Sequence, residues 1–73
     1  MNLNLKTIFS KKLKEAVEMS GKTYVELAAF LGVNKSTVSM YLHGNALPSL
    51  DVFNRITEFL DVSADFLLGK KEI

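Results

Sequence analysis

Residues 23–44, TYVELAAFLGVNKSTVSMYLHG, decide the predicted fold of this chain. The first half begins with Thr23 and Glu26 at the spacing of a capping box, in which each side chain accepts from the other residue's backbone N–H. The apolar residues that follow fall on one stripe at helical spacing: Leu27, Ala28 and Leu31. Gly32 then supplies the left-handed conformation that commonly ends a helix. This half therefore predicts a short helix that begins after Thr23.

The second half of the stretch predicts another short helix. Asn34 is a favourable N-cap residue, and Gly44 ends the helix. Its apolar face consists of residues at i, i+3 and i+4: Val38, Tyr41 and Leu42. The remaining side chains lie on the outer face: Lys35, Ser36, Ser39, Met40 and His43. Two short helices joined by a glycine-containing turn of a few residues form the helix-turn-helix pattern.

Three further helices complete the predicted fold. They span residues 7–19, 50–60 and 64–68, with Thr7, Ser49 and Ser63 as caps and Gly69 as the final stop. Asp61 stands where a helix-ending glycine is common, and aspartate tolerates the left-handed conformation. We expect an all-α fold in one domain: residues 1–6 form an N-terminal arm, residues 7–69 the domain and residues 70–73 a C-terminal tail.

The composition excludes several classes of function. The chain has no cysteine, which removes disulfides, thiolate catalysis and Cys-rich zinc sites. His43 is its only histidine, and no acid, base and nucleophile converge, so we expect neither an enzyme nor a metal site. Nothing indicates a cofactor or a small-molecule ligand. No apolar run has membrane-spanning length and no signal peptide is evident, so we expect a cytoplasmic protein.

The distribution of charge is more informative than the net charge of +1. Residues 1–48 carry a charge of +3, whereas residues 49–73 carry −2. A basic side that faces DNA and an acidic side that faces away from it would give this division. A mixed, solvated surface would give it equally well.

The ordered motifs of residues 9–69 resemble the phage repressor/Cro type of helix-turn-helix domain, also called XRE-like. The chain has the family's Thr-x-x-Glu-Leu-Ala start at Thr23, then Gly-Val, Ser-Thr-Val-Ser, and an aromatic residue followed by glycine. Pro-Ser-Leu and Val-Ser-x-Asp-Phe-Leu-Leu-Gly follow in the family's order. The resemblance implies a compact five-helix, lambda-repressor-like domain with the helix-turn-helix at its second and third helices. It also implies a regulator of transcription, usually a repressor, that binds double-stranded operator DNA as a dimer.

The resemblance makes the third helix a recognition helix, which lies in the major groove with its N-terminal residues nearest the base edges. The candidates for reading bases are Lys35, Ser36, Ser39 and Met40. Lys35 can donate to guanine O6 and N7, Ser36 can donate or accept, and Met40 offers an apolar surface to a thymine methyl group. The alternative is that Lys35 and Ser36 are ordinary first-turn residues.

A second set of residues is expected to contact phosphates. The free N–H groups at the start of the second helix attract anions, and Lys22, Thr23 and Tyr24 lie there. Tyr24 occupies a position where the family usually has a phosphate-binding glutamine. The remaining candidates begin the third helix or flank Gly44: Asn34, Thr37, His43 and Asn45. For Tyr24 and His43 the alternative is a merely exposed side chain.

Two positions depart from the family pattern. Many members have arginine at the position of Val17 and glutamate at that of Leu42, and these pair between the first and third helices. Here both residues are apolar, which can be neutral for stability but removes a cation near the DNA backbone. The family's cations are also absent at Met40 and after Gly44. This weak phosphate-binding complement keeps a second function open, that of an antitoxin-like or adaptor domain that binds a protein partner.

We also expect a homodimer, at least on DNA. The C-terminal third has more apolar residues than so small a core needs: Phe59, Phe66, Leu67 and Leu68. We expect a two-fold contact through these residues, with the last helix contributing most of it.

Overall fold

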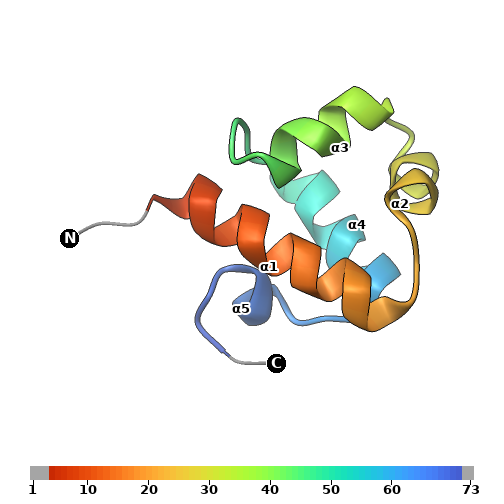
Figure 1. Cartoon of the computed structure of the whole chain (residues 1–73). Helices are drawn as coiled ribbons and strands as arrows, with labels where there is room; N and C mark the ends of the chain where they lie inside the picture. Colours follow the sequence, from red (N-terminus) through yellow and green to blue (C-terminus); the bar gives the residue numbers. More distant parts are fainter. Residues whose placement is uncertain (1–3, 72–73) are drawn as a thin grey trace.

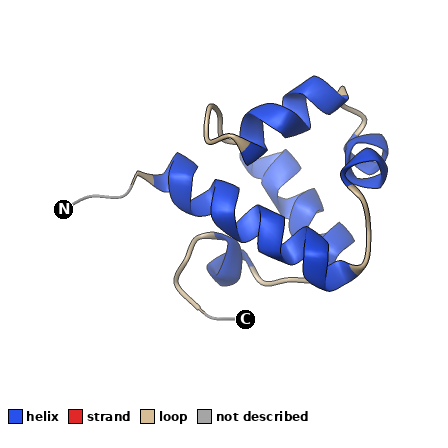
Figure 2. Cartoon of the chain, viewed as in Figure 1, coloured by secondary structure: helices blue, strands red, loops and turns tan. Residues whose placement is uncertain are grey.

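Five α-helices follow one another along residues 4–71, the part of the chain that this computed structural model describes. They are α1 (Leu5–Ser20), α2 (Tyr24–Leu31), α3 (Lys35–Leu42), α4 (Leu50–Leu60) and α5 (Ala64–Leu67). No strand occurs in these residues, so the predicted all-α class is confirmed (Figure 1, Figure 2). Within the same range, no helix is both long enough and apolar enough to cross a bilayer.

The start of α1 differs from the prediction. Asn4, not Thr7, caps the helix, because the Asn4 side chain accepts from the Thr7 backbone N–H at 2.9 Å. Leu5 and Lys6 therefore belong to α1 rather than to an arm, whose first residues, 1–3, lie outside the described part. Asparagine is at least as good a cap as threonine, and its placement three residues ahead of Thr7 gives the helix nearly one more turn. At its other end α1 includes Ser20, one residue more than predicted.

The caps of α4 and α5 are confirmed. The Ser49 hydroxyl accepts from the Val52 N–H at 3.2 Å, and the Ser63 hydroxyl accepts from the Phe66 N–H at 3.0 Å. Asp61 is left-handed, with φ of 55°, as its place after α4 predicted. The helix α5 ends at Leu67, one residue earlier than expected.

Gly69 fixes the path of the chain after α5. Its φ of 78° is left-handed, and a Cβ atom placed on it would lie 2.6 Å from Cγ2 of Ile8 in α1. Glycine is therefore needed here both for its backbone conformation and for the close approach of α1. Beyond it, the Lys70 backbone N–H donates to the Asp65 carbonyl at 2.8 Å. The predicted tail thus begins with a residue attached to α5, and residues 72–73 lie outside the described part.

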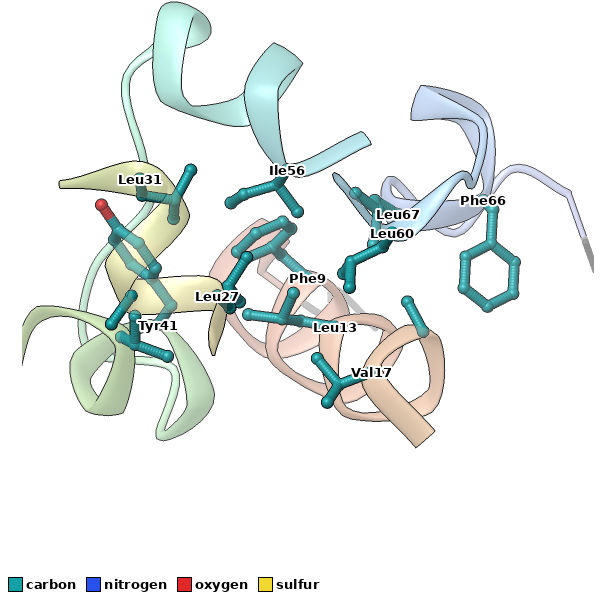
Figure 3. Packing of buried hydrophobic residues seen from close by; sticks show 13 residues of the cluster. Phe9, Leu13, Val17, Leu27, Leu31, Tyr41, Ile56, Leu60, Phe66 and Leu67 are labelled. Atoms are coloured by element: carbon teal, nitrogen blue, oxygen red, sulfur yellow. The ribbon is translucent and has the colours of Figure 1, made fainter. Parts of the chain in front are cut away.

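The apolar core lies between the buried face of α1 and side chains of the other four helices (Figure 3). Phe9 lies at its centre, with its ring edge-on to Tyr41 of α3 at 6.2 Å between centroids and tilted against Phe53 of α4 at 5.9 Å. The two positions that depart from the family pattern also join the core. Val17 is buried, and Leu42 is half-buried against the cluster. Apolar packing therefore occupies both positions.

The prediction that Phe66 and Leu67 form a dimer contact is wrong. Their side chains are only 1% and 0% exposed, because α5 folds back onto α1 and these residues complete the core. The ammonium group of Lys12 lies 5.0 Å from the centroid of the Phe66 ring and covers its outer side. Phe59 and Leu68 are half-buried. A small domain has few residues with which to build a core, and here two of the last helix are used for it, which the apolar count alone did not reveal.

The cap of α1 can be tested by a pair of substitutions. We expect Asn4→Ala to lower the free energy of unfolding by about 0.5–2 kcal/mol, because it leaves a helix N–H without its side-chain partner. Thr7→Ala should change it by less, since Thr7 lies inside the helix. Urea denaturation of the two variants measures both values. A larger loss for Thr7→Ala would restore Thr7 as the cap and contradict the helix start described above.

Candidate nucleic-acid interface

The capping box at the start of α2 forms as the sequence predicted. The Glu26 N–H donates to the Thr23 hydroxyl oxygen at 3.1 Å, and the Thr23 N–H donates to a Glu26 carboxylate oxygen at 2.8 Å. This arrangement engages the only carboxylate of α2 and α3. The Thr23 hydroxyl still has its own proton to donate to an external acceptor. The exposed start of α2 therefore has hydrogen-bond donors with no free carboxylate of α2 beside them.

A three-residue turn sets α3 against α2. Gly32 is left-handed with φ of 72°, and its N–H donates to the Ala29 carbonyl at 3.2 Å. The Val33 N–H donates to the Ala28 carbonyl at 3.1 Å. These two bonds reverse the chain at the end of α2, so that α2 and α3 lie together at one edge of the molecule (Figure 1). The predicted helix-turn-helix is confirmed.

Two buried residues determine which face of α3 is exposed. Val38 and Tyr41 are 1% and 6% exposed and point into the core. Burial raises the pKa of the Tyr41 hydroxyl above its ordinary value, so this side chain stays neutral. With these residues inside, Lys35, Ser36 and Met40 are exposed on the outer face of α3. Three of the four predicted base-reading residues thus share an open surface.

Ser39, the fourth predicted base-reading residue, is half-buried and bound to His43. The Ser39 hydroxyl lies 3.1 Å from Nδ1 of His43, and the Ser39 carbonyl oxygen lies 2.8 Å from the same nitrogen. Since a carbonyl oxygen only accepts, Nδ1 must carry a proton. Nε2 is then the ring nitrogen left for an external partner, and it can donate to an anion only when the imidazole is protonated on both nitrogens.

The predicted phosphate-contacting residues lie at the ends of α2 and α3. Asn34 precedes α3 with an exposed side chain that makes no cap hydrogen bond, so its amide is free to bind outward. Tyr24 is 38% exposed at the start of α2. The ammonium group of Lys22 lies 5.2 Å from the Phe59 ring centroid, a position that the sequence did not predict. Asn45 is exposed in the loop after α3, whereas Thr37 is half-buried.

Sequence reasoning missed two side chains that hold the C-terminal ends of these helices. The Ser10 hydroxyl of α1 donates to the Leu42 carbonyl oxygen, the last of α3. The Arg55 guanidinium of α4 donates to the Phe30 and Leu31 carbonyl oxygens of α2. A small polar residue on the core side of the first helix was an available signal for Ser10. Nothing in the local sequence points from Arg55 to α2, which is more than twenty residues away.

Comparison with known proteins finds the same motif. Residues 13–67 match a family model described as helix-turn-helix. The chain is 35% identical over 63 residues to the HTH-type transcriptional regulator ImmR of Bacillus subtilis (strain 168), an alignment that covers 86% of this chain and 50% of that protein. It is 33% identical over 61 residues to YonR of the same strain, named as an SPbeta prophage-derived uncharacterized HTH-type transcriptional regulator, with 84% of this chain and 56% of that protein covered.

The chain spans about half the length of these curated relatives. No solved structure matches the chain significantly.

The two helix caps at this surface should differ in their effect on stability. We expect Thr23→Ala to cost about 0.5–2 kcal/mol, because it breaks the capping box. Asn34→Ala should cost only a few tenths of a kcal/mol, since no cap hydrogen bond is lost. Thermal melting would separate them, because one kcal/mol shifts the Tm of a domain of this size by about 4–8 °C. Equal shifts in Tm would show that the Asn34 side chain caps α3 and is not free to bind an external partner.

Proposed function

The chain belongs to the helix-turn-helix family, and we propose that it is a sequence-specific DNA-binding regulator of transcription that inserts α3 into the major groove. The observation that carries the proposal is the exposed polar start of α3, held outward by the buried Val38 and Tyr41. The names of the relatives support a role in transcription. We propose repression by occlusion of a promoter, in the cytoplasm, as the mode of action.

The exposed side chains of α3 have different roles in this proposal. Lys35, in the first turn, donates to guanine O6 and N7, and Ser36 donates or accepts at a neighbouring base. Met40 is 47% exposed, and it stands one turn beyond Ser36, where only an apolar contact with a thymine methyl group is available. Ser39 contributes less, since its hydroxyl is shared with His43.

Phosphate contacts would position the domain from both sides of α3. Lys22, Thr23 and Tyr24 would bind the backbone through the start of α2, where unpaired N–H groups and the helix dipole favour an anion. Asn34 and Thr37 would contact it at the start of α3. His43 and Asn45 would do so at its end, His43 through Nε2. These contacts fix the register on the duplex without reading sequence.

Selection of bound sequences from a random DNA library provides the operator for a test of this function. We expect Lys35→Ala to weaken binding to that operator by about 1–3 kcal/mol and to relax the preference at one base pair. Met40→Ala should cause a smaller loss, confined to sites with thymine at its position and without a change in salt dependence. Tyr24→Phe should weaken binding to all sequences alike. Affinities for a panel of single-base operator variants, measured at several salt concentrations, distinguish these patterns.

One result would overturn the proposal. If Lys35→Ala and Met40→Ala leave the base preferences of the panel unchanged, α3 is not the reading element. Binding to a protein partner, as in an antitoxin-like or adaptor domain, would then be the better account of the fold.

We further propose that two copies meet through the leucine patch of Leu5, Leu47, Leu50 and Leu68, of which the sequence indicated only Leu68 as a dimer contact. These residues line an apolar groove, and Leu50 is 85% exposed, more than any other large apolar residue among those described. The loop between α3 and α4 carries both Leu47 and the phosphate-contacting Asn45. The patch therefore adjoins the proposed DNA-binding surface, where a copy bound to the next half-site would lie.

The proposed contact through the leucine patch can be tested by the number of copies that bind one operator. We expect sedimentation of the unmodified chain with operator DNA to give two copies per operator. Leu50→Asp should give one copy, because it places a charge in an apolar contact. Met19→Ser, which removes another exposed apolar side chain far from the groove, should behave like the unmodified chain. Two copies with Leu50→Asp, or a single copy without any substitution, would contradict this contact.

A further inference from the structure

We propose that Arg55 is a positioning residue that fixes the start of α3 through the C-terminal end of α2, an inference that rests on the proposed function of α3. The guanidinium donates from Nη2 to the Phe30 carbonyl oxygen at 2.6 Å and from Nη1 to the Leu31 carbonyl oxygen at 3.4 Å. These are the last two carbonyls of α2, whereas Arg55 belongs to α4. One side chain thus joins α4 to the point where the backbone leaves α2 for α3.

The turn leaves these two carbonyls for Arg55. The Gly32 and Val33 amides donate to the carbonyls of Ala29 and Ala28, so they satisfy the two preceding acceptors. In the described residues, no backbone N–H from outside α2 donates to the Phe30 or Leu31 carbonyl oxygen. The end of a helix carries partial negative charge, which attracts a cation. Arginine also has a planar fork that can reach two acceptors at once, unlike the single ammonium of lysine.

An aromatic pair holds the arginine in this position. The Arg55 guanidinium carbon lies 5.2 Å from the centroid of the Phe30 ring. That ring stacks on Phe59, with 4.6 Å between centroids and 25° between the ring planes. Phe59 stands one turn after Arg55 on α4, and its ring lies 5.2 Å from the ammonium of Lys22, which precedes α2. The helix α2 is therefore attached to α4 at both of its ends.

The first turn of α3 depends on this attachment. Its N-cap, Asn34, makes no side-chain hydrogen bond that would fix the start of the helix independently. Only residues 32–34 separate α3 from the carbonyls that Arg55 holds. A shift at the end of α2 therefore also displaces Lys35 and Ser36, the side chains proposed to lie nearest the bases. Arg55 thus acts on base reading without contacting DNA.

DNA binding by Arg55→Gln, Arg55→Lys and the control Lys70→Gln tests this role. We expect Arg55→Gln to weaken operator binding by about 2- to 30-fold, the usual range for residues that act away from a ligand. The loss should fall on the bases read by the first turn of α3, and the slope of binding against salt should not change, because no phosphate contact is lost. Arg55→Lys should show a smaller loss, since it keeps the charge but not the fork. Lys70→Gln removes the same charge from an exposed residue after α5 and should leave base preference intact.

Two outcomes of these measurements would overturn the proposal. A salt slope that falls by about one in Arg55→Gln would identify Arg55 as a phosphate contact. An unchanged base preference, at a temperature where the variant is fully folded, would leave Arg55 with a role in stability alone.

Hydrogen exchange without DNA separates this proposal from the proposed function. We expect Arg55→Gln to speed exchange of the Gly32, Val33 and Thr37 amides, while the Leu13 amide of α1 keeps its protection. If the unmodified chain selects no DNA sequence, the proposed function fails and this measurement alone decides the role of Arg55. Unchanged protection at the three amides would refute the positioning role even in a chain that binds DNA selectively.

Discussion

The short length of α2 and α3 is the constraint on which the rest of the structure depends. Each has eight residues, fewer than an isolated helix needs to be stable in water. Both must therefore be held by their surroundings. The helix α3 packs on α1, whereas α2 packs on α3 and α4. The C-terminal carbonyl of α3 accepts from Ser10, and those of α2 accept from Arg55. The flanking helices thus keep α2 and α3 folded and fix which of their side chains face outward.

The sequence predicted most of the helices because their signals are local. The capping box of Thr23 and Glu26, the left-handed Asp61 and the serine caps all depend on residues within four positions of one another. The start of α1 was missed because Asn4 and Thr7 are both acceptable caps, and in the structure the Asn4 side chain takes this role by accepting from the Thr7 N–H. The outward face of α3 was predictable for a similar reason, since Val38 and Tyr41 recur at helical spacing.

Other features could not be predicted, because they join segments that are far apart in the chain. The apolar count of the C-terminal third did not show whether Phe66 faces the core or a second copy; the packing of α5 on α1 decided that. The same holds for Arg55, whose acceptors lie on another helix, and for Lys22, which sits over Phe59 instead of extending freely from the start of α2. Long-range contacts of this kind have no sequence spacing by which to recognise them.

Because Val17 and Leu42 are apolar, no ion pair joins α1 to α3 at these positions, and this has a practical consequence. Among residues 4–71 the one ion pair is Lys12 with Glu15, 3.7 Å apart on the surface of α1, and such a pair contributes little to folding. The contacts that join the helices are apolar packing, contacts of a cation with an aromatic ring and hydrogen bonds to carbonyls. None of these pairs two opposite charges, and apolar packing, the largest part, is not screened by dissolved ions. Contacts with a nucleic-acid backbone, in contrast, are lost steeply as salt rises. Under the proposed function, concentrated salt should therefore strip bound nucleic acid from this protein during purification and leave a native chain behind.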